Sequence, residues 1–378
     1  MRFTFLHWGF SAWACYAVVG LALGLACHAH GQPLTMRSAL VPLFGRRLEG
    51  SLGHSVDIVS ILAIVAGITT TIVLELEQIC PGLSMVTGSP FFADTAGNPP
   101  LVAPLTALVV AIAVAISSTL SGVDRGVKWI SKVGVTAAFG MLVAFLLAMP
   151  DPRLAGILVD GLWTYLKTLP AEMFTVYVGE ESVISAVQAE WQADWTIFYW
   201  AWWIAFAPFV GLFLARISRG RTLREFILGA MIGPTAMSFV WFAVIGGSAL
   251  LLEADGTASG RIVAAPHAFR IYETVRLLFA GPAATFMNVA IAVLFLLLIV
   301  TSSTAAIIAI KSIGAAGGML SETPAHSLIW AVAIAAIAGA VMSVGGVQYV
   351  RDVMIIAAVP FSGIMALMLV SVLRPVLM

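Results

Sequence analysis

The chain has 378 residues, of which 61% are hydrophobic and only 10% are charged. A soluble protein of this size could not bury so much apolar surface, so much of it must face lipid. Lys plus Arg and Asp plus Glu are equal at 19 each, so no excess charge attracts nucleic acid. Three cysteines (Cys15, Cys27, Cys80) suit neither a disulfide scaffold nor a zinc site. Composition therefore excludes a soluble enzyme, a disordered protein and a nucleic-acid-binding protein.

Nine apolar segments recur along the chain, and each is a candidate membrane span, because a helix crosses the bilayer core with about 20 apolar residues. The segments are residues 3–27, 58–74, 101–120, 133–150, 195–215, 226–252, 277–310, 327–350 and 353–373. The short second segment is expected to extend back toward His54 and forward through Glu75 and Glu77. The linkers, of which 79–100, 151–193 and 253–276 are long and polar, are too short for a separate domain. The sequence predicts one all-α polytopic membrane unit over residues 1–378.

The distribution of positive charge predicts the orientation in the membrane. The linkers 28–55, 121–132, 216–224 and 311–325, with the C-terminal tail, hold 12 of the 19 Lys and Arg residues. Positively charged linkers stay on the cytoplasmic side, so we expect an external N-terminus and a cytoplasmic C-terminus. An external N-terminus without a cleavable signal peptide leads us to expect further spans before residue 1.

Two segments are unusually rich in aromatic residues. The first carries Trp8, Trp13 and Tyr16, whose spacings of five and three place the rings within about one face of a helix. The fifth carries four tryptophans, Trp195, Trp200, Trp202 and Trp203. One interpretation is an aromatic belt at the membrane interface. The other is a ligand site, since Trp13 and Tyr16 lie too deep for the headgroups and facing rings suit a quaternary ammonium ion.

Hydroxyl and acidic groups also lie within the apolar segments. Thr301-Ser302-Ser303-Thr304 and Thr69-Thr70-Thr71 either bond back to carbonyls one turn earlier or coordinate Na+. Glu75 and Glu77 are candidates as intramembrane acids, although the simpler interpretation is that the helix reaches the outer interface there. The sequence contains no metal cluster, nucleophile–base pair or phosphate loop, so it predicts no enzyme. His7 and His54 are interpreted as interfacial or hydrogen-bonded histidines.

The stretch DWTIFYWAWWIAFAPFVGLFLARISRGRTLREF, residues 194–226, resembles the signature of the bacterial betaine/carnitine/choline transporters. Further similar stretches are HWGFSAWACYAVVGLALG (7–24), PLTMRSALVPLFG (33–45), GHSVDI (53–58), SGVDRGVKWIS (121–131), the pair at 301–302 and IIAAVPFS (355–362). The resemblance implies a LeuT-type inverted-repeat transporter fold. The nine segments match family helices four to twelve, so we expect an N-terminally truncated copy that lacks the first three.

The resemblance also implies site residues. It places the substrate-binding aromatic box on Trp8, Trp13, Tyr16 and Trp203, with Trp200 and Trp202 as further signature tryptophans. It assigns Thr301 and Ser302 to the main sodium site and Phe209 to a second ion site, and Thr70 and Thr71 are added as candidate ion ligands. Phe206 stands where the family usually has tryptophan, and Thr304 where it often has aspartate.

The implied function is secondary active uptake of a quaternary ammonium osmolyte, such as glycine betaine, choline or carnitine, across the bacterial cytoplasmic membrane. The implied coupling ion is Na+ or H+, without a cofactor. The expected partners are the substrate, the lipid bilayer and, as is common in the family, two further copies in a homotrimer. The alternative is a non-transporting remnant, because an absent family helix normally lines the substrate and ion sites.

Overall fold

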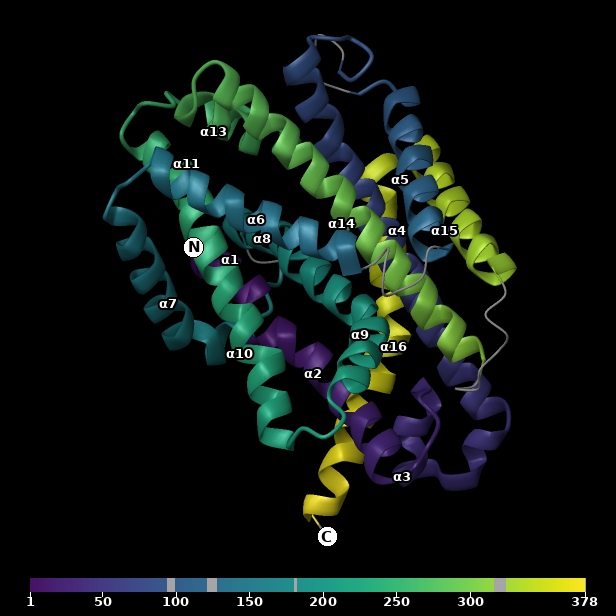
Figure 1. The fold of residues 1–378 in the computed structure, drawn as a ribbon. Coiled ribbons are helices and arrows are strands. Elements are labelled where there is room, and N and C mark those ends of the chain that lie inside the picture. Colours follow the sequence, from purple (N-terminus) through teal and green to yellow (C-terminus); the bar gives the residue numbers. More distant parts are fainter. Residues whose placement is uncertain (94–98, 121–127, 180–181, 316–323, 378) are drawn as a thin grey trace.

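The computed structural model describes residues 1–93, 99–120, 128–179, 182–315 and 324–377, and every regular element there is a helix (Figure 1). The α-helices are α1 (Arg2–Trp8), α2 (Phe10–Gly24), α3 (Val41–Phe44), α4 (Ser51–Thr87), α5 (Val102–Leu120), α6 (Lys128–Ala148), α7 (Arg153–Glu172), α8 (Val183–Trp191), α9 (Phe198–Ile217), α10 (Leu223–Trp241), α11 (Gly247–Ala254), α12 (Arg261–Ala264), α13 (Arg270–Leu278), α14 (Pro282–Gly314), α15 (Pro324–Val344) and α16 (Gly346–Leu377). Residues 121–127 of the motif 121–131 and 316–323 of the linker 311–325 lie outside the described residues.

The described chain contains an apolar helix at each of the nine predicted positions. Eight are long and apolar enough to cross a membrane, and the third, with its apolar stretch at Val102–Ser118, is shorter. Three of the eight are composite. A π-helical segment extends α2 through Ala29, a second joins α8 to α9, and a third joins α10 to α11. The prediction of an all-α, multi-span membrane fold is confirmed.

The second span is longer than predicted. α4 runs for 37 residues and ends at Gly88, whose left-handed backbone (φ 63°) lets its N–H bond to the Ser84 carbonyl. Pro81 lies inside α4 without ending it, and the Tyr272 hydroxyl donates to the nearby Gln78 carbonyl over 2.6 Å. Glu75 and Glu77 therefore lie about three turns before the helix end. The expectation that the helix ends near these acids was wrong, because buried apolar residues continue beyond them.

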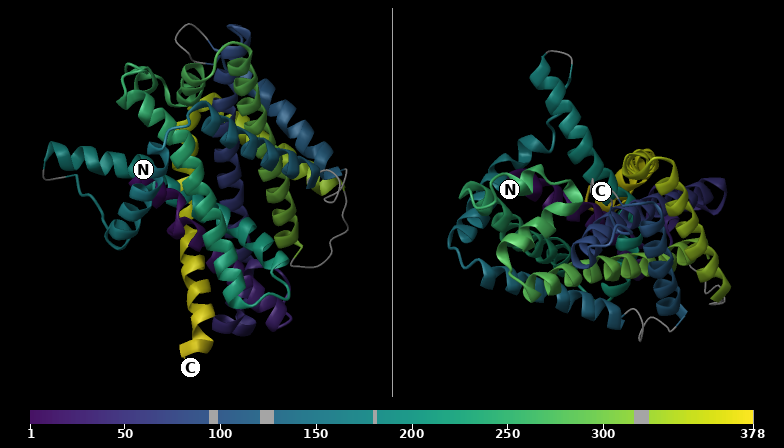
Figure 2. Two further views of the ribbon diagram at one scale, coloured as in Figure 1. Left: turned by 60° about the vertical axis from the view of Figure 1, so that its left-hand side comes forward. Right: turned by 90° about the horizontal axis from the view of Figure 1, so that it is seen from above.

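The linker 151–193 is also more ordered than its polar composition indicated. It contains α7 and the whole of α8, and the π-helical segment that joins α8 to α9 begins at its end. α7 buries one face against the bundle, whereas α8 projects from its body (Figure 2).

α4 is the central helix of the bundle. In its most apolar 18-residue stretch 72% of the residues are buried, compared with 22% in the corresponding stretches of α6, α15 and α16. It packs against α14, α16 and α9, and Figure 1 shows it crossing behind α14. The peripheral helices expose large apolar side chains such as Val109, Leu147 and Ile356, as expected of surfaces in contact with lipid.

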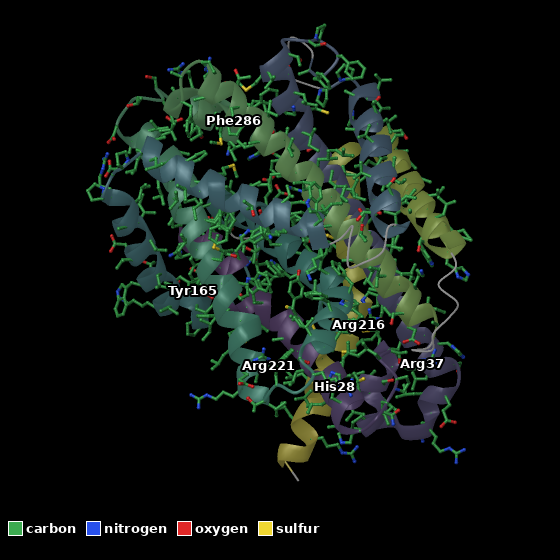
Figure 3. The ribbon with its side chains drawn as sticks, in the orientation of Figure 1. His28, Arg37, Tyr165, Arg216, Arg221 and Phe286 are labelled. Carbon is green, nitrogen blue, oxygen red and sulfur yellow. The ribbon has the colours of Figure 1, made fainter. Side chains whose placement is uncertain are left out.

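Positively charged linkers gather at one end of the bundle. Arg37, Arg216 and Arg221 all lie toward this end, where the C-terminal turns of α16 also lie (Figures 1 and 3). Arg37 is fixed by an ion pair with Asp57 of α4 over 2.5 Å. Basic residues of two linkers predicted to share one side of the membrane therefore lie at one end of the molecule with the C-terminal turns of α16, while the side itself remains a prediction.

α2 and α9 pack closely through glycine. A Cβ atom on Gly211 would lie 2.5 Å from Val19 Cγ1 and 3.0 Å from the Gly20 nitrogen. Small residues at a helix contact let two backbones approach in a membrane bundle. This contact places the aromatic half of α2 beside the aromatic half of α9.

Substituting Gly211→Ala should force α2 and α9 apart and lower the free energy of unfolding by about 1–3 kcal/mol, the usual cost of overpacking. Gly229→Ala is the matched control, because a Cβ atom there meets open space in α10. Thermal unfolding in detergent should show a lower midpoint for Gly211→Ala alone. Equal midpoints for both variants would contradict the close contact.

Candidate functional site

The first span is broken at Gly9, which separates α1 from α2 with an extended backbone (φ −94°, ψ −151°). In the membrane interior, backbone groups released by such a break must find new partners. The N–H of Phe10 donates to the Tyr165 hydroxyl over 2.9 Å. The carbonyl of Leu6 accepts a hydrogen bond from the Ser11 hydroxyl over 3.1 Å. Two hydroxyl groups thus each satisfy one backbone group that the break releases.

Four aromatic rings meet just beyond this break, and we call them the aromatic cluster: Trp8, Trp13, Tyr16 and Trp203. The Trp203 ring centroid lies 5.5 Å from that of Trp8, 5.2 Å from that of Trp13 and 4.9 Å from that of Tyr16. Trp203 and Tyr16 are each only 6% exposed. The four residues expected to form a box therefore lie together inside the bundle, so an interfacial belt does not describe them.

The cause of this convergence differs from the expectation. On an unbroken helix a spacing of five residues turns two side chains about 140° apart. Trp8 and Trp13 could not then both contact Trp203. The break at Gly9 redirects α1 relative to α2, and this brings both rings onto the same partner.

Two π-helical segments lie against α1, one of them in contact with the cluster. In Gln192–Ile197, the Thr196 hydroxyl hydrogen-bonds to Nε2 of the buried His7 over 3.0 Å. In Phe242–Gly246, the Phe242 ring lies 5.3 Å from that of Trp8. π-Helical turns inside α-helices are frequent at functional sites. Helix irregularities from three spans therefore lie next to Trp8 or to its neighbour His7.

Sequence reasoning missed Tyr199. Its ring stacks on His7 with centroids 4.9 Å apart and lies 5.8 Å from that of Trp8. A signal existed, because Tyr199 precedes Trp203 by four residues and so shares its face of α9. His7 was interpreted as interfacial or hydrogen-bonded; the second interpretation is correct.

Trp202 and Trp200 do not join the cluster. The Trp202 indole N–H donates to the Thr71 hydroxyl of α4 over 2.9 Å, and its ring stacks on Tyr199 at 6.0 Å. No ring contact is found for Trp200 among the described residues, and its buried indole N–H has no partner there. The structure thus brings together four of the six predicted aromatic residues, and a substrate-binding role for any of them remains a prediction.

The cluster is closed in this conformation. Its rings contact one another edge-on or tilted, at centroid separations of 4.9–5.6 Å. A cation held between two ring faces needs wider spacing, because it lies up to about 6 Å from each centroid. The buried indole N–H of Trp13 lacks an acceptor within the described residues. Ligand entry therefore requires the rings to separate, and this N–H can donate to an incoming oxygen.

The candidate ion ligands come from three helices that pack against one another: α4, α9 and α14. The Thr301 hydroxyl donates to the Leu297 carbonyl over 2.9 Å, and Thr70 and Thr71 also bond to carbonyls one turn earlier. These bonds use the hydroxyl hydrogens, as expected if the residues bond back to carbonyls one turn earlier. They leave lone pairs on the hydroxyl oxygens. In the described chain, no hydrogen bond joins Thr301 or Ser302 to the other candidates.

Three neighbouring polar groups have unused bonding capacity. The hydroxyls of Thr69 and Ser303 and one carboxylate oxygen of Glu75 are buried and lack hydrogen-bond partners within the described residues. Thr69 and Ser303 belong to the two hydroxyl runs noted in the sequence, although the candidates chosen from those runs were their neighbours.

The fold and this site define the chain as a polytopic membrane protein with an aromatic interior. It belongs to the BCCT, betaine/carnitine/choline transporter, family, whose family model matches residues 1–377. The family and the relatives below are transporters, in agreement with the expectation that the chain is not an enzyme.

Three relatives show the extent of the similarity. The high-affinity choline transport protein of Escherichia coli (strain K12) is 34% identical over 96% of this chain and 51% of its own length. The osmo-dependent choline transporter BetT2 of Acinetobacter baylyi is 32% identical over 99% of this chain and 53% of its own. The glycine betaine transporter OpuD of Bacillus subtilis (strain 168) is 30% identical over 98% and 69%. The chain thus spans about half to two thirds of the length of these relatives.

The hydrogen bond between Trp202 and Thr71 yields a stability prediction. Thr71→Val should leave the Trp202 indole N–H without its acceptor and lower the free energy of unfolding by about 1–3 kcal/mol. Thr71→Ser is the control, because it keeps the hydroxyl. Thermal unfolding in detergent should place Thr71→Ser near the wild type and Thr71→Val clearly below it; the reverse order would refute the assignment.

Proposed function

We propose that this protein takes part in secondary active uptake of a quaternary ammonium osmolyte across the bacterial cytoplasmic membrane. The observation that carries the proposal is the aromatic cluster, in which rings from two spans meet inside the bundle around Trp203. Ring faces attract a quaternary ammonium ion without a counter-charge. Membership of the betaine/carnitine/choline family supports the same class of substrate.

Choline and glycine betaine are the substrates that the relatives' names favour. Both carry a trimethylammonium group and an oxygen that can accept a hydrogen bond. The indole N–H of Trp13, which has no acceptor within the described residues, is a suitable donor for that oxygen. We propose that the trimethylammonium group occupies the opened cluster and that the oxygen faces Trp13.

Symport with Na+ or H+ is the proposed means of coupling. Its support is the concentration of hydroxyl groups on α4 and α14, where Thr70 and Thr301 keep oxygen lone pairs while they bond back within their helices. Thr71, Ser302 and Phe209 are the other candidates, and Phe209 belongs to the core that α4, α9 and α14 share. Na+ takes oxygen ligands of this kind at the midplane of transporters. The LeuT-type repeat, the external N-terminus and a homotrimer belong to this proposal as further expectations.

Substitutions at Trp203 test the proposed cluster in the purified chain, with choline binding followed by tryptophan fluorescence. Trp203→Ala should abolish binding, whereas Trp203→Phe should weaken it by roughly 2- to 30-fold, because each ring contact contributes about 0.5–2 kcal/mol. Trp163→Ala is the matched control, since Trp163 of α7 is 69% exposed. Equal losses with alanine and phenylalanine would argue against attraction by the ring face. An uncharged isostere of choline should not bind.

The ion site has a separate test in the same assay. Replacing Thr301 and Ser302 together by alanine should raise the sodium concentration needed for half-maximal choline binding, if Na+ is the coupling ion. Ser343→Ala on α15 is the control, because its hydroxyl also bonds back within its helix, over 2.7 Å to the Ala340 carbonyl, but lies outside the candidate set. An unchanged sodium requirement in the double variant would leave these hydroxyls with their helix bonds alone.

A further inference from the structure

The break at Gly9 depends on a residue from outside the two spans that form the aromatic cluster. Tyr165 belongs to α7, which lies beside α10 at the edge of the bundle (Figures 1 and 3). Its hydroxyl accepts the Phe10 N–H over 2.9 Å. Phe10 is the first residue of α2, and the N–H groups of a first helical turn have no partner within the helix. Tyr165 therefore supplies the cap that α2 lacks in its own sequence.

The space around this hydroxyl is closely fitted. A Cβ atom on Gly9 would lie 2.5 Å from the Tyr165 hydroxyl oxygen and 2.4 Å from the Phe5 carbonyl oxygen. Tyr165 is only 1% exposed, and its ring packs edge-on against Phe239 of α10 at 5.2 Å. Glycine at position 9 is therefore required for the approach of the hydroxyl, and the ring has no room to withdraw.

α7 is held in place along its whole length. At its beginning, Arg153 forms ion pairs with Asp151 over 2.7 Å and with Asp255, beyond α11, over 2.6 Å. These bonds hold the pKa values of both carboxyl groups below their usual range, so the pairs persist at neutral pH and weaken only in acid. At its end, Glu172 lies 3.5 Å from Arg2 of α1. Tyr165 thus projects from a helix that ion pairs hold at both ends.

The break decides where the cluster rings point. Trp8 precedes it and Trp13 follows it, yet both rings contact Trp203. We propose that Tyr165 is a positioning residue for the aromatic cluster: its hydroxyl holds the break at Gly9 in the geometry that turns Trp8 and Trp13 onto the same ring. α7 thereby controls the shape of the ligand site without touching it. The effect on ligand affinity rests on the proposed function, whereas the effect on ring geometry does not.

The decisive variant is Tyr165→Phe, which keeps the ring and removes only the hydroxyl. Tyr272→Phe is the matched control, because Tyr272 is equally buried and its hydroxyl also bonds to a backbone group, the Gln78 carbonyl. Both variants should lose stability. Only Tyr165→Phe should alter the near-ultraviolet circular dichroism that arises from the stacked tryptophans in the full 378-residue chain in detergent.

Choline titration of the same samples gives a second readout. Tyr165→Phe should weaken choline binding by roughly 5- to 100-fold, the range produced by one unsatisfied buried N–H group, and Tyr272→Phe should leave it unchanged. If Tyr165→Phe matches Tyr272→Phe in both readouts, the proposal is overturned. If the wild type binds no choline, the proposed function fails, and the dichroism comparison still decides the role of Tyr165.

A rescue variant tests the mechanism itself. Proline has no N–H and is favoured at the first position of a helix, so Phe10→Pro removes the group that Tyr165 satisfies. In the Tyr165→Phe background, Phe10→Pro should restore the dichroism and the choline affinity toward those of Phe10→Pro alone. Failure to restore either property would show that the hydroxyl acts on something other than the Phe10 N–H, and would overturn the proposed positioning.

Discussion

The need to hydrogen-bond every backbone group inside an apolar bundle governs the arrangement of this protein's interior. A helix meets that need with its own residues, so a break in a membrane span is stable only where other groups replace the lost bonds. At Gly9 the hydroxyls of Tyr165 and Ser11 each replace one of them, for the Phe10 N–H and the Leu6 carbonyl. The break in turn lets Trp8 and Trp13 contact one ring, and the aromatic cluster therefore depends on two hydroxyls that lie outside it.

α9 connects the cluster to the rest of the core because its two aromatic faces serve different purposes. Trp203 faces α2 and forms the centre of the cluster, whereas the adjacent Trp202 faces α4 and bonds to Thr71. Consecutive residues on a helix point about 100° apart, so one helix can contribute to both surfaces. Tyr199 contacts both Trp8 and Trp202, which makes it the physical link between the aromatic cluster and the ring that bonds to the central helix.

The hydroxyl-rich segments of α4 and α14 illustrate how one feature can serve two roles. Each threonine with a bond to the carbonyl one turn earlier is stable in a helix, and this bond uses only its hydrogen. The lone pairs that no other donor uses are left for a cation, although the Thr71 oxygen also accepts the Trp202 indole N–H. A hydroxyl at these positions can therefore keep its hydrogen bond within the helix and also bind an ion through its oxygen. The dependence of ligand binding on the ion concentration, and not the geometry, distinguishes the two roles.

The sequence by itself determined the class of fold, because membrane spans are local: about 20 apolar residues form a helix wherever they lie, and all nine were located. The signature in α9 and its matches elsewhere identified the family and the four rings that meet. The extent of α4 beyond Pro81, the order in α7 and the contacts of Tyr199 and Tyr165 were decided by tertiary structure. These features depend on partners distant in the chain, 155 residues apart for Phe10 and Tyr165. The local pattern of apolar residues contains no information about a partner so distant in the chain. The helix break that directs the rings could therefore be found only in the folded protein.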